Sequence, residues 1–373
     1  MERVVVVGGG VLGTMHAIEA RKRGYEVVQL EREREARGAS VRNFGLVWVS
    51  GRRPGVEVRL ALRARQLWEE IAALAPGTGF RPHGSMTLAS SEAELHVLKE
   101  ALGLPDAEQR GFELLDPAAV RAVNPALRGE YLGGLWCRND AIVEPRVAQP
   151  ALRAYLLSGG KTGGYQWLPG REAVEIGANG VRDHTGAWHH GDLVVLCTGA
   201  TLTGLAGPHL AGFATPPVRR VRLQLMQTRP LGDRLTTSVA DADSLRYYPA
   251  YDLPGLRLLA PQDPVAAQAR AQLLLVQRAD GGLTIGDTHE YDEPFTFDVD
   301  EEAYDHLRAR AELLLGQPLP PVQRRWAGVY SEVTDPGEHL YLRSEVAPGV
   351  VLVTGPGGRG MTCSPAIAEE TFA

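Results

Sequence analysis

Residues 3–33, RVVVVGGGVLGTMHAIEARKRGYEVVQLERE, decide the fold of this chain. Four successive valines are typical of a strand buried on both faces, as in a parallel sheet. Gly8, Gly10 and Gly13 follow with the spacing GxGxxG, and a helix is predicted over residues 11–23. The first glycine permits a tight turn, the second lets a pyrophosphate approach the backbone, and the third lets helix and strand pack closely.

A second apolar strand, EVVQL, leads to Glu31. A carboxylate at the end of this strand can hold a ribose 2′-hydroxyl, and the phosphates of a dinucleotide would lie at the amino end of the first helix. The motif predicts a dinucleotide site but does not distinguish FAD from NAD(P). The alternative is a glycine-rich turn that holds no ligand.

The composition narrows the function classes. A chain of 373 residues suits two domains or one large one, and 44% hydrophobic with 23% charged residues is typical of a globular protein. A net charge of −6 gives no reason to expect nucleic acid or an anionic membrane as partner. Neither a signal peptide nor a spanning helix is predicted, so we expect a cytoplasmic protein. Three cysteines without CxxC spacing argue against disulfides and a metal site.

Three further segments bear on the identity of the dinucleotide. The first, RGASVRNFGLVW at 37–48, is rich in small residues and would let the backbone pass close to a flat ligand. The second, at 172–200, contains alternating strands and then the apolar strand LVVLCTG. The third, VLVTGPGGRGMTCSP at 351–365, runs from an apolar strand into a glycine-rich loop.

Together these segments resemble the superfamily of FAD enzymes that includes D-amino-acid oxidase, glycine oxidase and sarcosine oxidase, over nearly the whole chain. The resemblance implies an α/β fold in which a Rossmann-like FAD-binding domain is interleaved with an antiparallel-sheet α+β substrate domain. The FAD-binding domain would comprise residues 1–79, 139–215 and 335–373, and the substrate domain residues 80–138 and 216–334.

The substrate half shows strand patterns consistent with such a sheet. RRVRLQLMQT, LRYYPAYD, RLLAP and AQLLLVQRADGGLTIGDT alternate or run apolar, and we expect them to form antiparallel strands. A helix is predicted near residues 299–316.

The resemblance implies that FAD is bound non-covalently, because Tyr330 and Ser331 stand near the position of the cysteine that holds flavin in some members. Backbone near Val174 would meet the adenine. The loop at 355–360 would run beside the isoalloxazine and stabilise negative charge on the reduced ring. The residues expected to bind FAD are Gly8, Gly10, Val11, Leu12, Gly13, Glu31, Arg32, Ser40, Arg42, Asn43, Val174, Thr198, Gly199, Gly355, Gly357, Gly358, Arg359, Gly360, Met361 and Thr362.

One departure from the family concerns the substrate. In glycine-oxidase-like members, Trp-Ala-Gly is followed by an arginine that clamps the substrate carboxylate, whereas WAGVYS has Tyr330 there. Arg359 is then the favoured anion anchor, and Arg359 and Tyr330 are the candidate catalytic residues. The other candidate substrate-binding residues are Arg246, Tyr247, Tyr248, Trp48 and His83, with a packing role open for His83, Trp48 and one of the two tyrosines.

Within the superfamily, LQLMQT, ADSLRYYPAYD and WAGVYS resemble the branch associated with aminophosphonate catabolism. The resemblance implies oxidation of a small anionic amine close to 2-aminoethylphosphonate or its N-methyl form, by hydride transfer to flavin N5 and imine hydrolysis. The electron acceptor would be O2 or another acceptor, since only Lys22, Lys99 and Lys161 are lysines and none matches the lysine that promotes the oxygen reaction in monomeric sarcosine oxidases.

Four alternatives stay open. The substrate is instead glycine, sarcosine or a proline-like amino acid; or the chain is a flavoprotein subunit that passes electrons to a partner; or it binds FAD without catalysis. A monooxygenase is a further alternative, but no second nucleotide motif for NAD(P)H is found.

Overall fold

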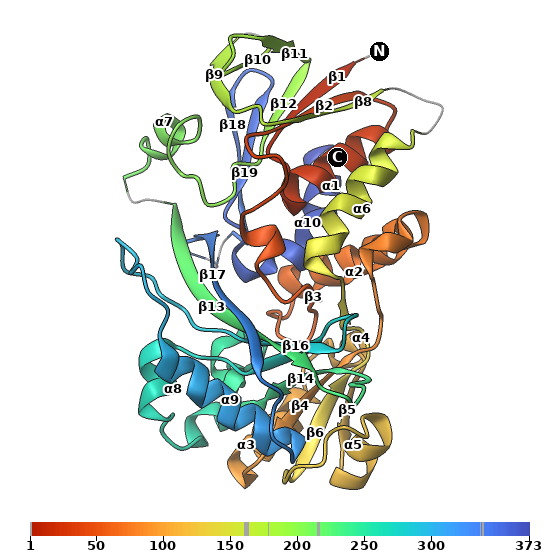
Figure 1. Cartoon of the computed structure of the whole chain (residues 1–373), viewed down its shortest axis with the longest axis vertical. Helices are drawn as coiled ribbons and strands as arrows, with labels where there is room; N and C mark the ends of the chain where they lie inside the picture. The colour runs from red at the N-terminus through yellow and green to blue at the C-terminus, as the bar shows by residue number, and fades with distance from the viewer. Residues whose placement is uncertain (1, 160–163, 178, 215–216, 336, 338) are drawn as a thin grey trace.

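The computed structural model describes residues 2–159, 164–177, 179–214, 217–335, 337 and 339–373. Two large sheets dominate it, one in the upper and one in the lower half of Figure 1, with helices packed beside each. This mixed α/β architecture agrees with the predicted fold class. The predicted domain boundary at 215–216 lies outside the described residues, and the division into two domains stays a prediction.

The first sheet is built around the valine-rich strand. Neighbouring strands of this sheet run parallel to each other, except that the edge strand β18 is antiparallel to β19. In spatial order the strands are β18 (Leu342–Ala347), β19 (Val350–Thr354), β12 (Leu193–Leu196), β1 (Arg3–Val7), β2 (Glu26–Glu31) and β8 (Tyr165–Pro169).

Both faces of β1 are covered, which explains its run of valines. Val4 and Val6 pack into a cluster with four helices, and Val5 and Val7 pack on the other face beside a three-stranded sheet. The helices are α1 (Val11–Lys22), α2 (Val56–Leu74), α6 (Pro145–Leu157) and α10 (Gly360–Thr371), and the small sheet comprises β9 (Ala173–Gly177), β10 (Gly180–Asp183) and β11 (Trp188–His190).

The second sheet has eight strands and is antiparallel except for the parallel pair β14–β4. Its longest members, β13 and β17, pair along most of their length and reach toward the first sheet (Figure 1). The strands in spatial order are β17 (Val322–Val333), β13 (Val218–Pro230), β16 (Gly282–Gly286), β15 (Leu274–Gln277), β14 (Ser238–Asp241), β4 (Ser85–Ala89), β6 (Gly133–Cys137) and β5 (Phe112–Leu115).

The two faces of this sheet have different roles. Leu275 and Ile285 pack with the apolar side of α9 (Glu301–Leu315). Leu274 and Leu225, whose side chains point the opposite way, join a cluster that contains Trp48. The strand alternation therefore places a helix on one face and leaves the other face toward the first sheet.

The remaining elements connect these layers. The short strands β3 (Leu46–Val47) and β7 (Ala141–Ile142) pair with each other. The other helices are α3 (Glu92–Ala101), α4 (Ala107–Arg110), α5 (Pro117–Val123), α7 (Gly207–Leu210) and α8 (Pro264–Ala269), and the short 3₁₀ turns are η1 (Ala39–Val41), η2 (Pro76–Thr78), η3 (Ala242–Tyr247), η4 (Pro249–Tyr251), η5 (Pro254–Leu258) and η6 (Gly357–Arg359).

The prediction that LRYYPAYD and RLLAP form strands is wrong. The first segment lies in η3 and η4, and the second begins in η5. The Asp241 carboxylate accepts hydrogen bonds from the backbone N–H of Ser244 (3.1 Å) and from its hydroxyl (2.7 Å). This cap turns the chain out of β14, and Pro249 lacks the N–H that a ladder would need.

The contact between the large sheet and α9 predicts the effect of a core truncation. Leu275 is 0% exposed, so Leu275→Ala should lower the free energy of unfolding by about 2–5 kcal/mol through lost burial and the cavity left behind. Leu313 on the outer side of α9 is 61% exposed, and Leu313→Ala should change it by less than about 0.5 kcal/mol. Urea unfolding of both variants checks this, and equal losses would contradict the packing.

Candidate functional site

A cavity of about 950 Å³ lies between the two sheets. Its volume is near the upper end of the range for ligand pockets, roughly 300–1,000 Å³. One end is lined by the turn after β1, by the end of β2 and by β9, and the other end by β13, β15, η3 and β17. The cavity therefore joins the predicted nucleotide elements to the predicted substrate elements.

The glycine turn at the end of β1 forms one wall. Gly8 has a φ of +113°, which favours glycine, and a Cβ on Gly13 would lie 2.2 Å from the carbonyl oxygen of Gly8. The N–H of Gly9 donates to Glu31 Oε2 (2.7 Å), and the N–H of Val11 donates to Ser40 Oγ (2.8 Å). Strand, turn and helix thus approach as closely as the GxGxxG spacing predicts.

Most residues predicted to bind FAD line this cavity. The polar side chains of segment 37–48 also hold that loop: Arg42 donates to the carbonyl of Arg37 (2.8 Å) and to that of Ala327 in β17 (2.9 Å), and Asn43 donates to the carbonyl of Ala39 (2.7 Å). The lining members are Gly8, Gly10, Val11, Leu12, Gly13, Glu31, Arg32, Ser40, Arg42, Asn43, Val174, Thr198, Gly199, Gly357, Gly358, Arg359, Gly360 and Met361.

Two residues predicted to bind FAD, Gly355 and Thr362, do not line the cavity. The N–H of Gly355 donates to Ser331 Oγ (3.1 Å), which ties the loop to β17. Thr362 Oγ1 accepts from the N–H of Trp48 (2.9 Å) and donates to the carbonyl of Leu46 (3.2 Å). Both residues therefore hold the walls of the cavity in place from behind.

A cluster of three charged side chains lies beside the glycine-rich loop. Arg359 Nε donates to Glu57 Oε1 (2.6 Å), and Arg52 Nη1 lies 3.7 Å from the same oxygen. The side chains of Arg359, Arg52 and Glu57 are only 12%, 8% and 2% exposed. Both arginines line the cavity, and the cluster carries an excess of one positive charge. Arg52 and Glu57 could not be predicted from the sequence, because Glu57 lies inside α2 and no motif marks either residue.

The structure separates the predicted substrate residues into two groups. Trp48, Tyr247, Tyr248 and Tyr330 line the cavity. Both members of the tyrosine pair do so, because Tyr247 ends the 3₁₀ turn η3 and Tyr248 connects it to η4, so that the two do not alternate along a strand. The rings of Trp48 and Tyr248 lie 6.0 Å apart.

Arg246 and His83 do not line the cavity. Arg246 Nε donates to Asp243 Oδ1 (2.8 Å) and its Nη2 to the carbonyl of Ala260 (2.5 Å), so its charge is neutralised behind η3. His83 precedes β4, where burial lowers its pKa to about 4 and Arg81 acts in the same direction. The prediction of these two as substrate ligands is not supported by the geometry.

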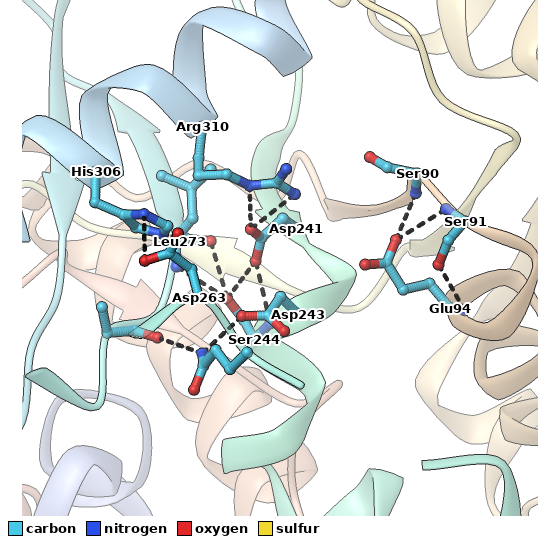
Figure 2. A network of polar contacts seen from close by, with 12 residues as sticks. Ser90, Ser91, Glu94, Asp241, Asp243, Ser244, Asp263, Leu273, His306 and Arg310 are labelled. Carbon is cyan, nitrogen blue, oxygen red and sulfur yellow. Dashed lines mark hydrogen bonds and ion pairs between the residues drawn. The ribbon is translucent and has the colours of Figure 1, made fainter. Parts of the chain in front are cut away.

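A polar network behind η3 explains the orientation of its tyrosines. Figure 2 shows Asp241 between the cap on Ser244 and Arg310 of α9, whose Nε lies 3.4 Å from Asp241 Oδ2. Asp243 accepts from Gln262 Nε2 (2.6 Å), and Gln262 Oε1 accepts from the Tyr247 hydroxyl (3.0 Å). The network fixes η3 between α9 and the loop before α8.

Four residues that the sequence analysis did not identify complete the far end of the cavity: Gln272, Asp287, His289 and Tyr291. The His289 ring stacks between Tyr247 (6.1 Å) and Tyr291 (6.4 Å). Asp287 directly follows β16 and is buried, and burial raises the pKa of its carboxyl group. These residues surround the end of one sheet strand, where no sequence motif draws attention to them.

The described residues contain neither a candidate metal site nor a candidate membrane-spanning helix. No group of three or more histidine, cysteine, aspartate or glutamate side chains there could hold a metal ion, and none of the helices there combines the length and apolarity needed to span a membrane. Neither Lys22 nor Lys99 lines the cavity, and Lys161 lies outside the described residues.

The chain matches the family described as DAO, FAD dependent oxidoreductase, over residues 3–373. It is 30% identical to a D-amino-acid oxidase of Streptomyces coelicolor over 246 residues, which are 65% of this chain and 63% of that protein. The chain thus spans less than two thirds of that relative's length.

Two solved structures share the fold over nearly the whole chain. A glycine oxidase from Geobacillus kaustophilus matches with a TM-score of 0.76 and 21% identity, covering 100% of this chain and 94% of that one. An L-proline dehydrogenase from P. horikoshii matches with a TM-score of 0.76 and 22% identity, covering 99% and 91%. The predicted fold class and the prediction of an FAD-dependent oxidoreductase are confirmed.

The residues that line the cavity are compatible with bound FAD. The glycine turn has no side chain at Gly10, where an added Cβ would lie 3.0 Å from Ser40 Oγ, so the backbone of the turn stays uncovered beside Ser40. Trp48 Nε1 and Thr198 Oγ1 are buried without a hydrogen-bond partner among the described residues, and both residues line the cavity. A large polar ligand would satisfy such groups.

The close approach at Gly13 predicts a loss of cofactor binding. Gly13→Ala forces a Cβ against the backbone oxygen of Gly8, and we expect the purified variant to retain less than about a tenth of the wild-type FAD, since a tenfold loss corresponds to about 1.4 kcal/mol. The ratio of absorbance at the flavin band to that of the protein measures this. Gly164→Ala is the matched control, because its added Cβ meets nothing within 4 Å. Equal FAD contents would contradict the interpretation.

Proposed function

The chain belongs to the family of FAD dependent oxidoreductases, and from this premise we propose that it oxidises the C–N bond of a small amine that also carries an anionic group. The substrate class that we propose is an aminophosphonate related to 2-aminoethylphosphonate or its N-methyl form. The residues proposed to act on it are Arg359 and Tyr330, with Tyr247, Tyr248 and Trp48 lining the same space and Arg52 added.

The observation that carries this proposal is the cluster of Arg52, Glu57 and Arg359. Two guanidinium groups share one buried carboxylate, so one positive charge in the wall of the cavity is left for a ligand. Buried cations are costly unless they are paired, and an anionic substrate group would complete the balance. The cluster lies directly beside the loop at 357–361, which is proposed to contact the flavin.

Tyr330 supports a phosphonate over a carboxylate. By the resemblance to glycine-oxidase-like members, Tyr330 would replace their carboxylate-binding arginine, and it lines the cavity together with Tyr248. A planar carboxylate is matched by one bidentate guanidinium, whereas a tetrahedral dianion accepts hydrogen bonds from several directions. Hydroxyl groups and arginines placed around one space suit the second geometry.

Bound FAD would supply the two-electron acceptor for the hydride on the carbon next to nitrogen. The chain's own residues bind and orient: Arg52 and Arg359 would hold the anion, and Tyr248 and Tyr330 would direct it. Leu223 and Leu225 of β13 line the same cavity and exclude water from the reacting carbon. The imine product then hydrolyses in water to a carbonyl compound and an amine or ammonia.

A glycine- or sarcosine-type amino acid is the second candidate substrate. The same arginine cluster can bind a carboxylate, and the relative at 30% identity carries the name D-amino-acid oxidase. A flavoprotein subunit that passes its electrons to a partner is the alternative to an oxidase. It is favoured by the absence of a lysine from the described lining of the cavity.

An anaerobic titration distinguishes these substrates. The purified protein is mixed separately with 2-aminoethylphosphonate, its N-methyl derivative, glycine and sarcosine, and the oxidised-flavin band is followed. Selective loss of the band with a phosphonate is the expected result. Loss with glycine or sarcosine alone would overturn the phosphonate proposal, and flavin reduction without peroxide formation in air would identify a partner acceptor.

Arg359→Ala should raise KM for the anionic substrate by about 10- to 100-fold, because a charge-assisted hydrogen bond contributes about 1.5–3 kcal/mol. Steady-state kinetics with the substrate found above measure the change. Arg246→Lys is the matched control: it alters an arginine that is paired with Asp243 outside the cavity and should leave KM within about twofold. An unchanged KM in Arg359→Ala would remove Arg359 from the anion site.

A further inference from the structure

Asp287 presents a charged group to the cavity that the proposed function has not used. It follows β16, is 8% exposed and lines the cavity. Its Oδ1 has no hydrogen-bond partner, and the described part of the chain gives the carboxylate no ion pair. A buried carboxylate without a partner is costly, and such groups in native proteins are retained for a reason.

Two arginines of the neighbouring strand β13 are already paired, and Arg270 holds its guanidinium over the Tyr291 ring, 4.8 Å from its centroid. Arg222 of β13 pairs with Glu290 (2.6 Å), and Arg219 pairs with Glu332 (2.6 Å). The Nδ1 of His289 lies 3.1 Å from the carbonyl oxygen of Arg270. The carboxylate of Asp287 is therefore left for a ligand.

Phenol side chains line the cavity together with Asp287. Burial raises the pKa of Tyr248, which directly follows η3, of Tyr330 in β17 and of Tyr291. The His289 imidazole and Gln272 line the same end of the cavity. This end of the cavity thus combines one acid that has no ion pair among the described residues with aromatic rings, an environment that suits a small organic cation.

We propose that Asp287 is the residue that receives the amino group of the substrate, pairing with its ammonium form and accepting one of its protons. In this step the N–H bond breaks, an O–H bond forms on the carboxyl group, and the electron pair of the N–H bond remains on nitrogen as a lone pair. No electrons are lost in the step, and the neutral amine is the form that can be oxidised. The assignment rests on the proposed oxidation of an amine at this site.

The consequence for specificity is a separation of charges along the cavity. The cluster of Arg52, Glu57 and Arg359 favours the anionic group of the substrate, and Asp287 favours its cationic group. A zwitterion satisfies both, whereas an anion without an amino group leaves Asp287 unpaired. Discrimination by an unsatisfied buried charge is large compared with discrimination by shape alone.

Binding of three probes to the FAD-loaded protein tests the pairing, read from the perturbation of the flavin spectrum. The first, 2-amino-2-methylpropylphosphonate, has no hydrogen on the carbon next to nitrogen and cannot be oxidised there. The second, 2,2-dimethylpropylphosphonate, replaces the amino group with a methyl group. The third, tert-butylammonium, carries the amine without an anion.

We expect Asp287→Asn to weaken binding of the first and third probes about 10- to 100-fold, because an ion-assisted hydrogen bond is lost. Binding of the second probe should be unchanged or tighter, which also shows that the variant is folded. Glu290→Gln is the matched control: it removes the same charge three residues away, where the carboxylate pairs with Arg222, and should change each affinity less than about twofold.

The three probes separate the two proposals. If the phosphonates fail to bind but tert-butylammonium binding still depends on Asp287, the substrate class is wrong and the role of Asp287 holds. If Asp287→Asn binds the first and third probes as tightly as the wild type, the role of Asp287 is overturned while the phosphonate proposal stands.

Proton acceptance is tested by the pH dependence of kcat/KM. In the wild type the carboxylate removes the ammonium proton, so activity should persist below the pKa of the free amine. In Asp287→Asn the rate should fall about tenfold per pH unit below that pKa and approach the wild-type rate above it. Asp287→Glu should restore part of the low-pH activity. Superimposable pH profiles for wild type and Asp287→Asn would overturn the proton-transfer role.

Discussion

The contact on which the rest of the structure depends is the close approach of Gly13 to the end of β1. At this point α1 lies against the carbonyl oxygen of Gly8, with no room for a side chain between them. Gly8 in turn lies against the backbone of Cys197 at the end of β12. The amino end of α1 is thereby aimed at the edge of the sheet where β1, β2 and β12 end. The nucleotide half of the cavity exists because three backbone segments converge at van der Waals distance.

The substrate half is organised by a different principle, the distribution of charge. On one side Glu57 holds two arginines in place and leaves one positive charge over. On the other side Asp287 has no ion pair among the described residues, and the phenols of Tyr248 and Tyr330 line the same cavity. Backbone shape alone does not define either region. Each depends on a buried charged group whose charge the described residues do not fully balance. The low polarity between them strengthens the attraction of each for an opposite charge.

The sequence predicted what local geometry dictates. GxGxxG between a strand and a helix admits few backbone paths, so Gly8, Gly10, Gly13 and Glu31 could be placed before the structure was known. The family resemblance extended this to the closing loop and to the fold class. The positions of the charged side chains around the cavity could not be predicted, because they depend on contacts that form only in the folded chain. Arg246 directly precedes two tyrosines that line the cavity. Its guanidinium nevertheless lies outside the cavity, because it pairs with Asp243.

The 3₁₀ turn η3 illustrates the same limit. Tyr247 and Tyr248 read as alternating strand residues, and the side-chain cap from Asp241 overrides that pattern. Asp287 was passed over because a single aspartate after a strand is usually a turn residue. Only the folded arrangement shows that no ion pair reaches it from the described residues.

The link between β17 and the closing loop has a mechanical consequence. The N–H of Val333 donates to the carbonyl of Gly355 (3.0 Å), and the N–H of Gly355 donates to Ser331 Oγ (3.1 Å). Tyr330 is adjacent on the same strand. These hydrogen bonds couple the position of β17, which lines the cavity at Tyr330, to the position of the glycine-rich loop. A displacement of Tyr330 would therefore be accompanied by a displacement of the loop that we propose to contact the flavin.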